Sequence, residues 1–257
     1  MQYITVAAAR SMNGLRLVLS AGVPGPWGEA AKAILNARNV PFAAVSQQPM
    51  AANPELREWT GRRNAPIAVY NEEPPCLGWY DILMLAERLG TGPSLLPAQS
   101  ADRALCVGFS MELCGQDGFG WQRRLNILAK VAGTEPAAGA EPHQREIFQN
   151  YGMNKAAVER AAGRTADILL ALTSQLKSQR AQGSRYLVGA TLTALDLYWA
   201  CFSQMCSPMA PEDSPMPDYL RAFYADVPDK VAAALDPILI EHRDDIFRRH
   251  IGLPMEF

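Results

Sequence analysis

A strand–helix–strand pattern near the N-terminus places the tightest constraint on the fold. Residues 15–21 (LRLVLSA) and 41–46 (PFAAVS) are short apolar runs, and the segment EAAKAILNARN between them is rich in Ala and straight-chain residues. Such a pattern is typical of two buried strands joined by a helix. Pro26 lies just before the helix, where a fixed φ is favourable. The segment therefore predicts a parallel βαβ unit.

A second group of patterns continues this α/β region. A polar loop, with one short helix near PELREW, leads to a strand over 65–70 (APIAVY) and a brief edge strand at CLG. The segment 79–90 (WYDILMLAERLG) has an apolar face at helical spacing and ends on Gly90, a common C-terminal stop. The order of elements is thus βαβ, a loop, and then ββα.

No convincing strand follows. Helical patterns run through 101–115, 122–133, 154–179, 193–206, 217–227 and 228–252, with Pro-rich loops at 135–143 and 207–218. We expect an α/β domain over residues 1–92, a linker over 93–100 and an all-helical domain over 101–257. Residues 1–14 form an N-terminal extension of the first domain in this division.

Composition and charge limit the kinds of partner that the protein is expected to bind. The chain has 257 residues, 49% of them hydrophobic, which is enough for a substantial core. A formal net charge of −2 gives no electrostatic reason to expect nucleic acid or an anionic membrane as a partner. No apolar run reaches the roughly 20 residues of a membrane span, and the N-terminus lacks the order of a signal peptide. We expect a cytoplasmic protein without a nucleic-acid or membrane partner.

The cysteines and histidines do not predict a metal site. The five cysteines are an odd number without a CxxC pair, so a metal cluster or a disulfide framework is not expected. Cys76, in a Pro-rich loop, is the one we expect to be most exposed. None of the histidines has a partner three or four residues away, so surface or helix-capping roles are expected for His143, His242 and His250.

Two local motifs carry more information. Pro66 stands at the start of a strand, where a cis Ala65–Pro66 bond is one solution and an ordinary trans proline is the other. Thr193 and Asp196 lie three residues apart directly before an apolar helix. This spacing predicts a capping box, with the carboxylate of Asp196 accepting from the N–H of residue 193. The capping box is interpreted as a folding device rather than a catalytic one.

Together these features resemble the glutathione transferase superfamily. Gly189, Thr193 and Asp196 match the family's G-x-x-x-T-x-x-D signature, and residues 64–90 resemble its proline–strand–helix segment. The likeness extends from about residue 15 to residue 250. It implies a thioredoxin-like N-terminal domain, an all-helical C-terminal domain, a cis bond before Pro66, glutathione as co-substrate and a homodimer.

The sequence departs from this family at the residue that activates the glutathione thiol. The family usually places a Tyr at the end of the first strand, or a Ser or Cys at the start of the first helix. Here the corresponding residues are Ala21 and Gly28, which have no side-chain donor. Ser20 is the nearest hydroxyl and a weak catalytic candidate; the alternative is a strand serine directed into the sheet.

A second departure affects the γ-glutamyl contact. The family usually has Glu-Ser or Gln-Ser at the start of the helix after the fourth strand, where this chain has Gly78-Trp79. The backbone N–H groups of that helix remain available to a carboxylate. Each lost charged hydrogen bond is worth about 1.5–3 kcal/mol, so two such losses weaken glutathione binding by about 10- to 1000-fold or more.

Two functions remain open. The first is an enzyme that activates glutathione through backbone donors around Gly28, because a helix N-terminus can lower a thiol pKa. The second is a non-catalytic binding or interaction protein with a degraded glutathione site. In both cases the ligand contacts are expected at Trp27, Ala65, Pro66, Gly78 and Trp79.

Several of these side chains have a second interpretation. Trp27 and Trp79 either line an aromatic pocket or pack at the domain junction. Arg62 and Arg63 either pair with a ligand carboxylate or belong to a solvated loop. The acceptor substrate is expected to be a small, largely apolar electrophile, held by an apolar pocket whose candidate residues, each also suited to the core, are Phe109, Met111, Phe119 and Trp121.

Overall fold

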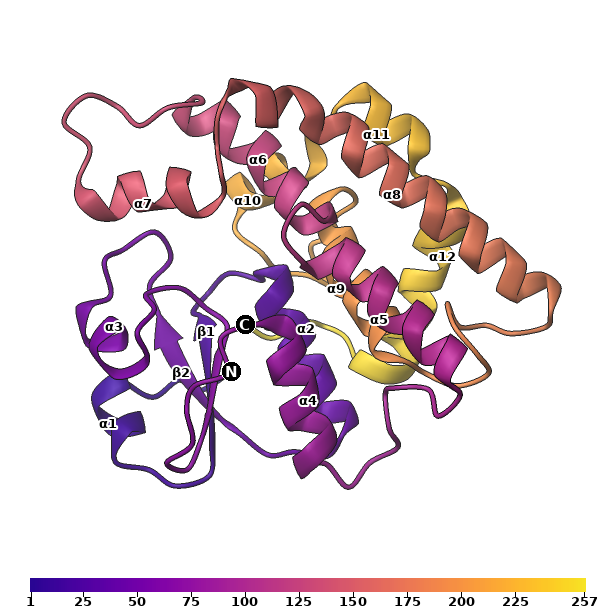
Figure 1. The fold of residues 1–257 in the computed structure, drawn as a ribbon, viewed down its shortest axis with the longest axis horizontal. Coiled ribbons are helices and arrows are strands. Elements are labelled where there is room, and N and C mark those ends of the chain that lie inside the picture. Colours follow the sequence, from indigo (N-terminus) through magenta and orange to yellow (C-terminus); the bar gives the residue numbers. More distant parts are fainter.

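A three-stranded mixed sheet forms the centre of the N-terminal part of the chain in the computed structural model, which describes residues 1–257 (Figure 1). The strands are β1 (Leu15–Ser20), β2 (Ala43–Gln47) and β3 (Ile67–Tyr70), in the order β2-β1-β3. β1 pairs with β2 in parallel and with β3 in antiparallel orientation. The predicted βαβ unit is confirmed, with β1 as the buried central strand.

The alternation of side chains along β1 divides the helices between the two faces of the sheet. Leu17 and Leu19 face the helices α2 (Pro26–Ala37) and α4 (Trp79–Leu89) within the main core. Val18 faces the opposite side, in a smaller core with the helices α1 (Val6–Arg10) and α3 (Pro54–Thr60). Figure 1 shows α2 and α4 on one side of the strands and α1 and α3 on the other.

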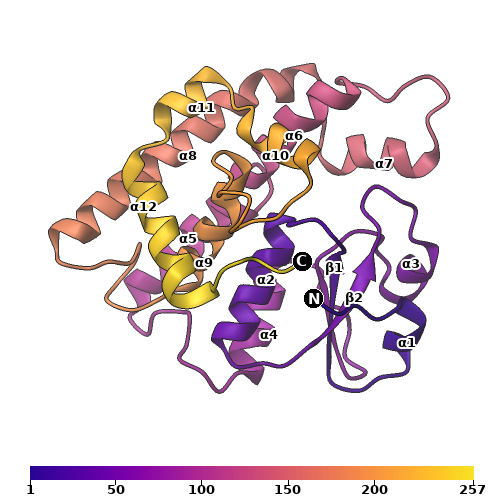
Figure 2. The ribbon, with the colours of Figure 1, turned by 180° about the vertical axis from the view of Figure 1, so that it is seen from behind.

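The edges of the sheet differ in part from the predicted strands. The brief edge strand expected at CLG is a single bridge between Ala68 and Cys76. At the other edge, the N-terminal extension contributes a parallel bridge between Ile4 and Val45. Both termini lie close to α2 and β1 in Figures 1 and 2, and the terminal amine of Met1 is 3.7 Å from the Glu256 carboxylate.

The rest of the chain is helical, as expected. Its α-helices are α5 (Ser100–Cys114), α6 (Phe119–Ala132), α7 (Pro142–Asn150), α8 (Lys155–Ala181), α9 (Ala194–Phe202), α10 (Asp218–Ala225), α11 (Asp229–Ala234) and α12 (Pro237–Ile246). A 3-10 turn (Ser203–Met205) follows α9 and a π-helical turn (Phe247–Ile251) follows α12. No helix is both long enough and apolar enough to cross a membrane.

The helix α9 is the centre of the molecule. All of its residues are buried, and it packs against α5 and α12 as well as against α2 of the N-terminal part. The main apolar core is therefore continuous between the sheet-bearing part and the helical part. This shared core fixes the position of the first turn of α2 relative to the C-terminal helices.

Two predictions in the C-terminal part are wrong. No helix is predicted between residues 133 and 154, yet α7 lies there, because Pro142 occupies the first helical position and Glu141 forms a capping box with Gln144. The single helix predicted over 228–252 is divided into α11 and α12. The Asp236 carboxylate accepts a hydrogen bond from Ile238 N at 3.0 Å and starts a new helix there.

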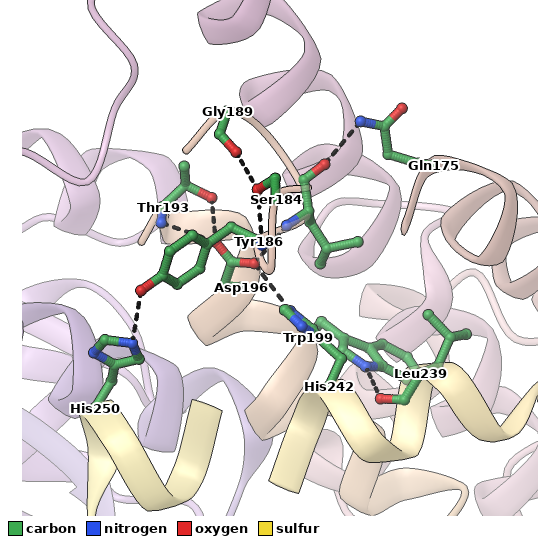
Figure 3. Close-up of polar contacts among 11 residues, drawn as sticks. Gln175, Ser184, Tyr186, Gly189, Thr193, Asp196, Trp199, Leu239, His242 and His250 are labelled. Carbon is green, nitrogen blue, oxygen red and sulfur yellow. Dashed lines mark hydrogen bonds and ion pairs between the residues drawn. The ribbon is translucent and has the colours of Figure 1, made fainter. Parts of the chain in front are cut away.

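The predicted capping box at the start of α9 is present and belongs to a larger polar cluster (Figure 3). Oδ2 of Asp196 accepts from Thr193 N at 2.9 Å and from Thr193 Oγ1 at 2.7 Å. Oδ1 accepts from Leu187 N at 2.8 Å and lies 2.9 Å from His242 Nε2. Gly189, in the preceding loop, has φ 68°, which explains the need for glycine at this position.

The expectation for His242 is wrong. His242 lies in α12 and is fully buried beside Asp196, rather than at the surface or at a helix cap. The reason is the packing of α12 against α9, which brings together residues that are 46 positions apart in the sequence. His250 is half-buried, and its Nε2 lies 3.3 Å from the Tyr186 hydroxyl (Figure 3).

Candidate functional site

A cavity of about 490 Å³ lies between the sheet-bearing part and the C-terminal helices. Its N-terminal side is formed by the end of β1, the first turns of α2 and α4, and residues 62–67. Its opposite side is formed by residues of α5, α6 and α7. We call this space the cleft.

The first turn of α2 presents free backbone donors to the cleft. Gly25 is the N-cap residue and makes no side-chain capping bond, while Pro26 has no N–H. The N–H groups of Trp27 and Gly28 therefore have no partner within the helix. An added Cβ at Gly28 would lie 3.1 Å from Cδ2 of Leu19, so a side chain there would have to displace its neighbour.

The Ser20 hydroxyl is engaged within the protein. Its Oγ donates to Oε1 of Gln47 at 2.8 Å, across the paired strands β1 and β2. The Gln47 amide is in turn held by the carbonyls of Gln48 at 2.7 Å and Arg63 at 3.2 Å. Ser20 lines the cleft, but the proton that it would have to donate to a ligand is directed at Gln47.

A further set of free backbone groups comes from Ala65 and α4. The Ala65–Pro66 peptide bond is cis, and neither the N–H nor the C=O of Ala65 has a hydrogen-bonding partner in the protein. Gly78 is the N-cap residue of α4 and also makes no side-chain capping bond. Ala65, Pro66, Gly78 and Trp79 all line the cleft.

Both tryptophans line the cleft and also pack at the junction of the two parts. Trp27 Nε1 donates to the carbonyl of Cys114 at 2.8 Å, and its ring meets Phe202 edge-on at 4.9 Å. The Trp79 ring meets Tyr198 edge-on at 5.5 Å, and its carbonyl accepts from the Tyr198 hydroxyl at 3.2 Å. Each ring therefore both lines the pocket and packs at the junction, so the two interpretations are not alternatives.

The C-terminal wall contains only some of the residues expected for an apolar pocket. Met111 and Trp121 line the cleft. Phe119 is fully buried and meets Trp199 at 5.8 Å between ring centres, so it belongs to the core. Phe109 packs against the core and is not among the lining residues.

Arg124 is the residue that sequence reasoning missed. It lies in α6 and lines the cleft, with its guanidinium carbon 5.4 Å from the centre of the Trp27 ring and 5.6 Å from that of Tyr151. No acidic side chain pairs with it within 4.0 Å. Trp121, Arg124 and Leu128 are three and four positions apart, which places them on one face of a helix. This spacing is the sequence signal that could have identified Arg124.

The two arginines before the proline strand behave differently. Arg62 is exposed and lines the cleft. Arg63 is buried, and its Nε lies 3.2 Å from Oε2 of Glu146 in α7, so its assignment to a solvated loop is wrong. Glu146 also lies 3.4 Å from Nη1 of Arg57 in α3. These ion pairs connect α7 to the N-terminal part across the mouth of the cleft.

The arrangement of sheet, helices and cleft matches solved structures over nearly the whole chain. A glutathione S-transferase from Methylobacterium radiotolerans, solved with glutathione sulfonate, has a TM-score of 0.62 at 14% identity and covers 95% of this chain and 97% of its own. The chain has the glutathione transferase fold. A glutathione transferase family member from Pseudomonas fluorescens, solved with two glutathione bound, has a TM-score of 0.62 at 17% identity, with 95% of this chain and 94% of its own covered.

A protein whose name is not that of a transferase shares the same fold. The nitrogen regulation fragment of the yeast prion protein Ure2p has a TM-score of 0.64 at 13% identity, covering 97% of this chain and 96% of its own. No protein-family model and no curated protein sequence matches the chain. At these identities the likeness establishes the glutathione transferase fold alone.

Burial shifts the pKa of three ionisable groups in or near the cleft. Glu29, in the first turn of α2, is buried; burial raises its pKa, while Lys32 at 2.8 Å opposes the shift. Burial raises the pKa of Cys114 well above its usual range, so this lining thiol is protonated at neutral pH. Cys76 is half-buried while the other four cysteines are buried, so it is the most exposed of the five, as expected; burial together with Asp81 raises its pKa.

Proposed function

We propose that the cleft binds glutathione and that the protein is a glutathione transferase-like enzyme acting on a small, largely apolar electrophile. One observation carries this proposal. The uncapped N-termini of α2 and α4 and the unpaired backbone of Ala65 all line the same cavity of about 490 Å³. An extended peptide with a thiol and two carboxylates needs this combination of donors.

Three groups of the ligand have a partner in this proposal. The N–H groups of Trp27 and Gly28 stabilise the thiolate, because the positive end of a helix lowers a thiol pKa. The N–H and C=O of Ala65 pair with the central peptide group. The first turn of α4, at Gly78 and Trp79, receives a carboxylate.

The solved relatives support the choice of ligand. Two neighbours that share the fold over at least 94% of their own chains were solved with glutathione or glutathione sulfonate. This chain retains the backbone donors at the corresponding helix ends but lacks the usual side-chain donors. We therefore expect glutathione to bind more weakly than in a transferase with both, by about 10-fold or more. The resemblance also leads us to propose a homodimer.

One observation favours a second candidate, a non-catalytic protein that binds a small molecule in the same cleft. The hydroxyl of Ser20 is held by Gln47 at 2.8 Å, and no other hydroxyl, thiol or histidine lies in the turn from Gly22 to Gly28. Thiol activation would then rest on backbone dipoles alone. If these are insufficient, the cleft binds glutathione without ionising it.

Calorimetric titration of the full chain with glutathione, combined with an ultraviolet pH titration of the bound thiol, distinguishes the two candidates. Binding with a thiol pKa below that of free glutathione supports the enzyme. Binding with an unchanged pKa supports the non-catalytic protein. S-methylglutathione is the matched control, since it keeps the peptide but has no ionisable thiol. Failure of both ligands to bind contradicts the proposal.

A further inference from the structure

From the surroundings of Arg124 we infer that the second substrate of this cleft carries a carboxylate on a flat, apolar body. Arg124 would bind the carboxylate, and the neighbouring aromatic and aliphatic side chains would bind the body. This inference rests on the proposed function, because it names the class of acceptor for the same site.

The charges of the cleft favour an anion. The acidic and basic side chains that line the cleft are those of Arg62, Arg63, Arg124 and Glu29. Arg63 is paired with Glu146 from α7, and Glu29 is paired with Lys32. Arg62 and Arg124 have no acidic partner within 4.0 Å. The cleft therefore has an excess of positive charge, which attracts an anionic ligand and disfavours a cationic one.

The two unpaired arginines differ in their surroundings. Arg62 is exposed at the rim, where water solvates its charge. Arg124 is partly buried between Trp27 and Tyr151. Its Nη1 makes only one long hydrogen bond, to the Tyr151 hydroxyl at 3.4 Å. Stacking on the two rings fixes the guanidinium plane, while most of its N–H donors remain for a ligand.

A carboxylate suits this donor set. A planar guanidinium held in one orientation can donate two parallel hydrogen bonds to a carboxylate, and such pairs are stronger than neutral hydrogen bonds. Trp27 belongs to the first turn of α2. The site for the carboxylate thus lies beside the helix end to which we assign the thiolate, as a second substrate requires.

The body of the acceptor is indicated by the wall around Arg124. Trp121 and Leu128 lie on the same face of α6, three positions before Arg124 and four after it, and both line the cleft. Ile147 and Tyr151 of the α7 region line it from the other side. Leu128 and Ile147 are buried in a small apolar core, and the half-buried rings of Trp121 and Tyr151 pack against it. An aromatic ring or a flat unsaturated chain would cover the exposed parts of these two rings, whereas a small hydrophilic acid would leave them in water.

Calorimetric binding of cinnamate and its neutral analogue cinnamamide, in the absence of glutathione, tests this inference. The two probes share the body and differ in the charge that Arg124 would recognise. We expect cinnamate to bind the unmodified protein at least about tenfold more tightly than cinnamamide. Arg124→Gln should remove this preference and leave cinnamamide binding within about twofold. Arg160→Gln on α8, an exposed arginine outside the cleft, makes the same charge change and should preserve the preference.

Three outcomes would overturn the inference. The first is equal binding of both probes, or no binding of either, to the unmodified protein. The second is an equal loss for both probes in Arg124→Gln, which would assign the residue to packing. The third is a preference for cinnamate that Arg124→Gln preserves. Glutathione titration of the same variant separates the proposals: lost glutathione binding or a raised thiol pKa, without a change in probe preference, assigns Arg124 to glutathione.

Discussion

The N-termini of α9 and α2 differ in whether side chains of the protein satisfy their free backbone N–H groups. At α9, the side chains of Thr193 and Asp196 meet the free donors of the first turn and of the preceding loop. At α2, no side chain caps the helix, and the N–H groups of Trp27 and Gly28 open into the cleft. Both helix ends lie next to the shared core.

This difference distinguishes backbone donors that stabilise the fold from backbone donors that are free to bind a ligand. A buried helix end without a partner is costly, so α9 could not be buried without its carboxylate. The ends of α2 and α4 avoid that cost only because they face an open cavity. Backbone donors left unsatisfied at two such ends are the reason to expect a ligand there.

The largest expected effect is at the N-terminus of α9, where side chains satisfy the backbone donors. Asp196→Ala removes a fully buried carboxylate that accepts from Thr193 and Leu187 and contacts His242. We expect a loss of about 3 kcal/mol or more in the free energy of unfolding, because the buried donors of Thr193 and Leu187 lose their acceptor at a cost of about 1–3 kcal/mol each. Urea unfolding measures it.

Asp196→Asn is the matched control for this prediction. It keeps one carbonyl acceptor and the volume of the side chain, so the loss should be smaller than for alanine. A loss below about 0.5 kcal/mol for Asp196→Ala, the level of a surface change, would contradict the view that this carboxylate stabilises the helix end. It would also remove the contrast between α9 and α2.

The second-largest expected effect concerns the ion pair between Glu29 and Lys32 in α2. Lys32→Met leaves Glu29 buried without its partner at 2.8 Å. We expect a loss of about 2 kcal/mol in the free energy of unfolding at pH 8, because an unpaired buried charge bears its desolvation cost. Lys32→Arg, which keeps the charge, is the control.

The loss in Lys32→Met should depend on pH. Burial already raises the pKa of Glu29, and Lys32 opposes that shift, so the variant raises the pKa further. A carboxyl with a raised pKa in the folded state favours folding below its unfolded pKa, near about 4.3, and loses this contribution as the pH rises through the folded pKa. The destabilisation should therefore grow from pH 5 to pH 8. A loss that is constant over this range would show that charge is not its cause.

Local patterns were enough to predict the parts of the fold that depend on neighbouring residues. The βαβ unit, the break at Gly90 and the capping box at Thr193 and Asp196 all follow from residues within one turn or one strand. The whole of α7 is missed, although Glu141, Pro142 and Gln144 carry the same kind of signal, because the prolines and glycines within residues 133–142 favour a loop.

The incorrect site assignments involve partners that are distant in sequence. His242 was expected near the surface because its partner Asp196 is 46 positions away. The solvated-loop alternative fails for Arg63 because its partner Glu146 lies 83 positions away, on a helix that local patterns do not predict. Arg124 was not singled out because its aromatic neighbours come from α2 and from the end of α7. Burial and charge pairing are properties of tertiary contacts, which single-sequence patterns do not contain.

A smaller effect is expected from closing the open end of α2. Gly28→Val places a branched side chain where Cβ alone would lie 3.1 Å from Leu19 Cδ2. The shift needed to accommodate it should misplace the N–H donors of the first turn. If the protein is catalytic, we expect a loss of at least about tenfold, or about 1.4 kcal/mol, in the glutathione-dependent rate. Gly28→Ala, which adds only Cβ, should lose less, and a rate unchanged in Gly28→Val would contradict the role of this helix end.

Thr193→Ala should cost about 1 kcal/mol of unfolding free energy, within the range of about 0.5–2 kcal/mol for a lost N-cap. Its hydroxyl and its N–H both contact Oδ2 of Asp196. The effects of Thr193→Ala and Asp196→Ala should therefore be less than additive in a double-mutant cycle. Urea unfolding of the two single variants and the double variant provides the coupling energy, and a coupling of zero would argue against a reciprocal capping box.

The smallest expected effect is that of Ser20→Ala on the glutathione-dependent rate. Ser20 is the last residue of β1, and its Oγ donates to Gln47 at 2.8 Å. The proton is thus directed along the sheet, while the N–H groups of Trp27 and Gly28 face the cleft. We expect a loss below about fivefold, which corresponds to less than about 1 kcal/mol, and little change in the pKa of the bound thiol. Gln47→Leu is the matched control, because it frees the hydroxyl without removing it. A loss of 100-fold or more in Ser20→Ala, about 2.7 kcal/mol, together with a nearly silent Gly28→Val, would identify Ser20 as the displaced activating residue. It would also show that the open helix end is not what ionises the thiol.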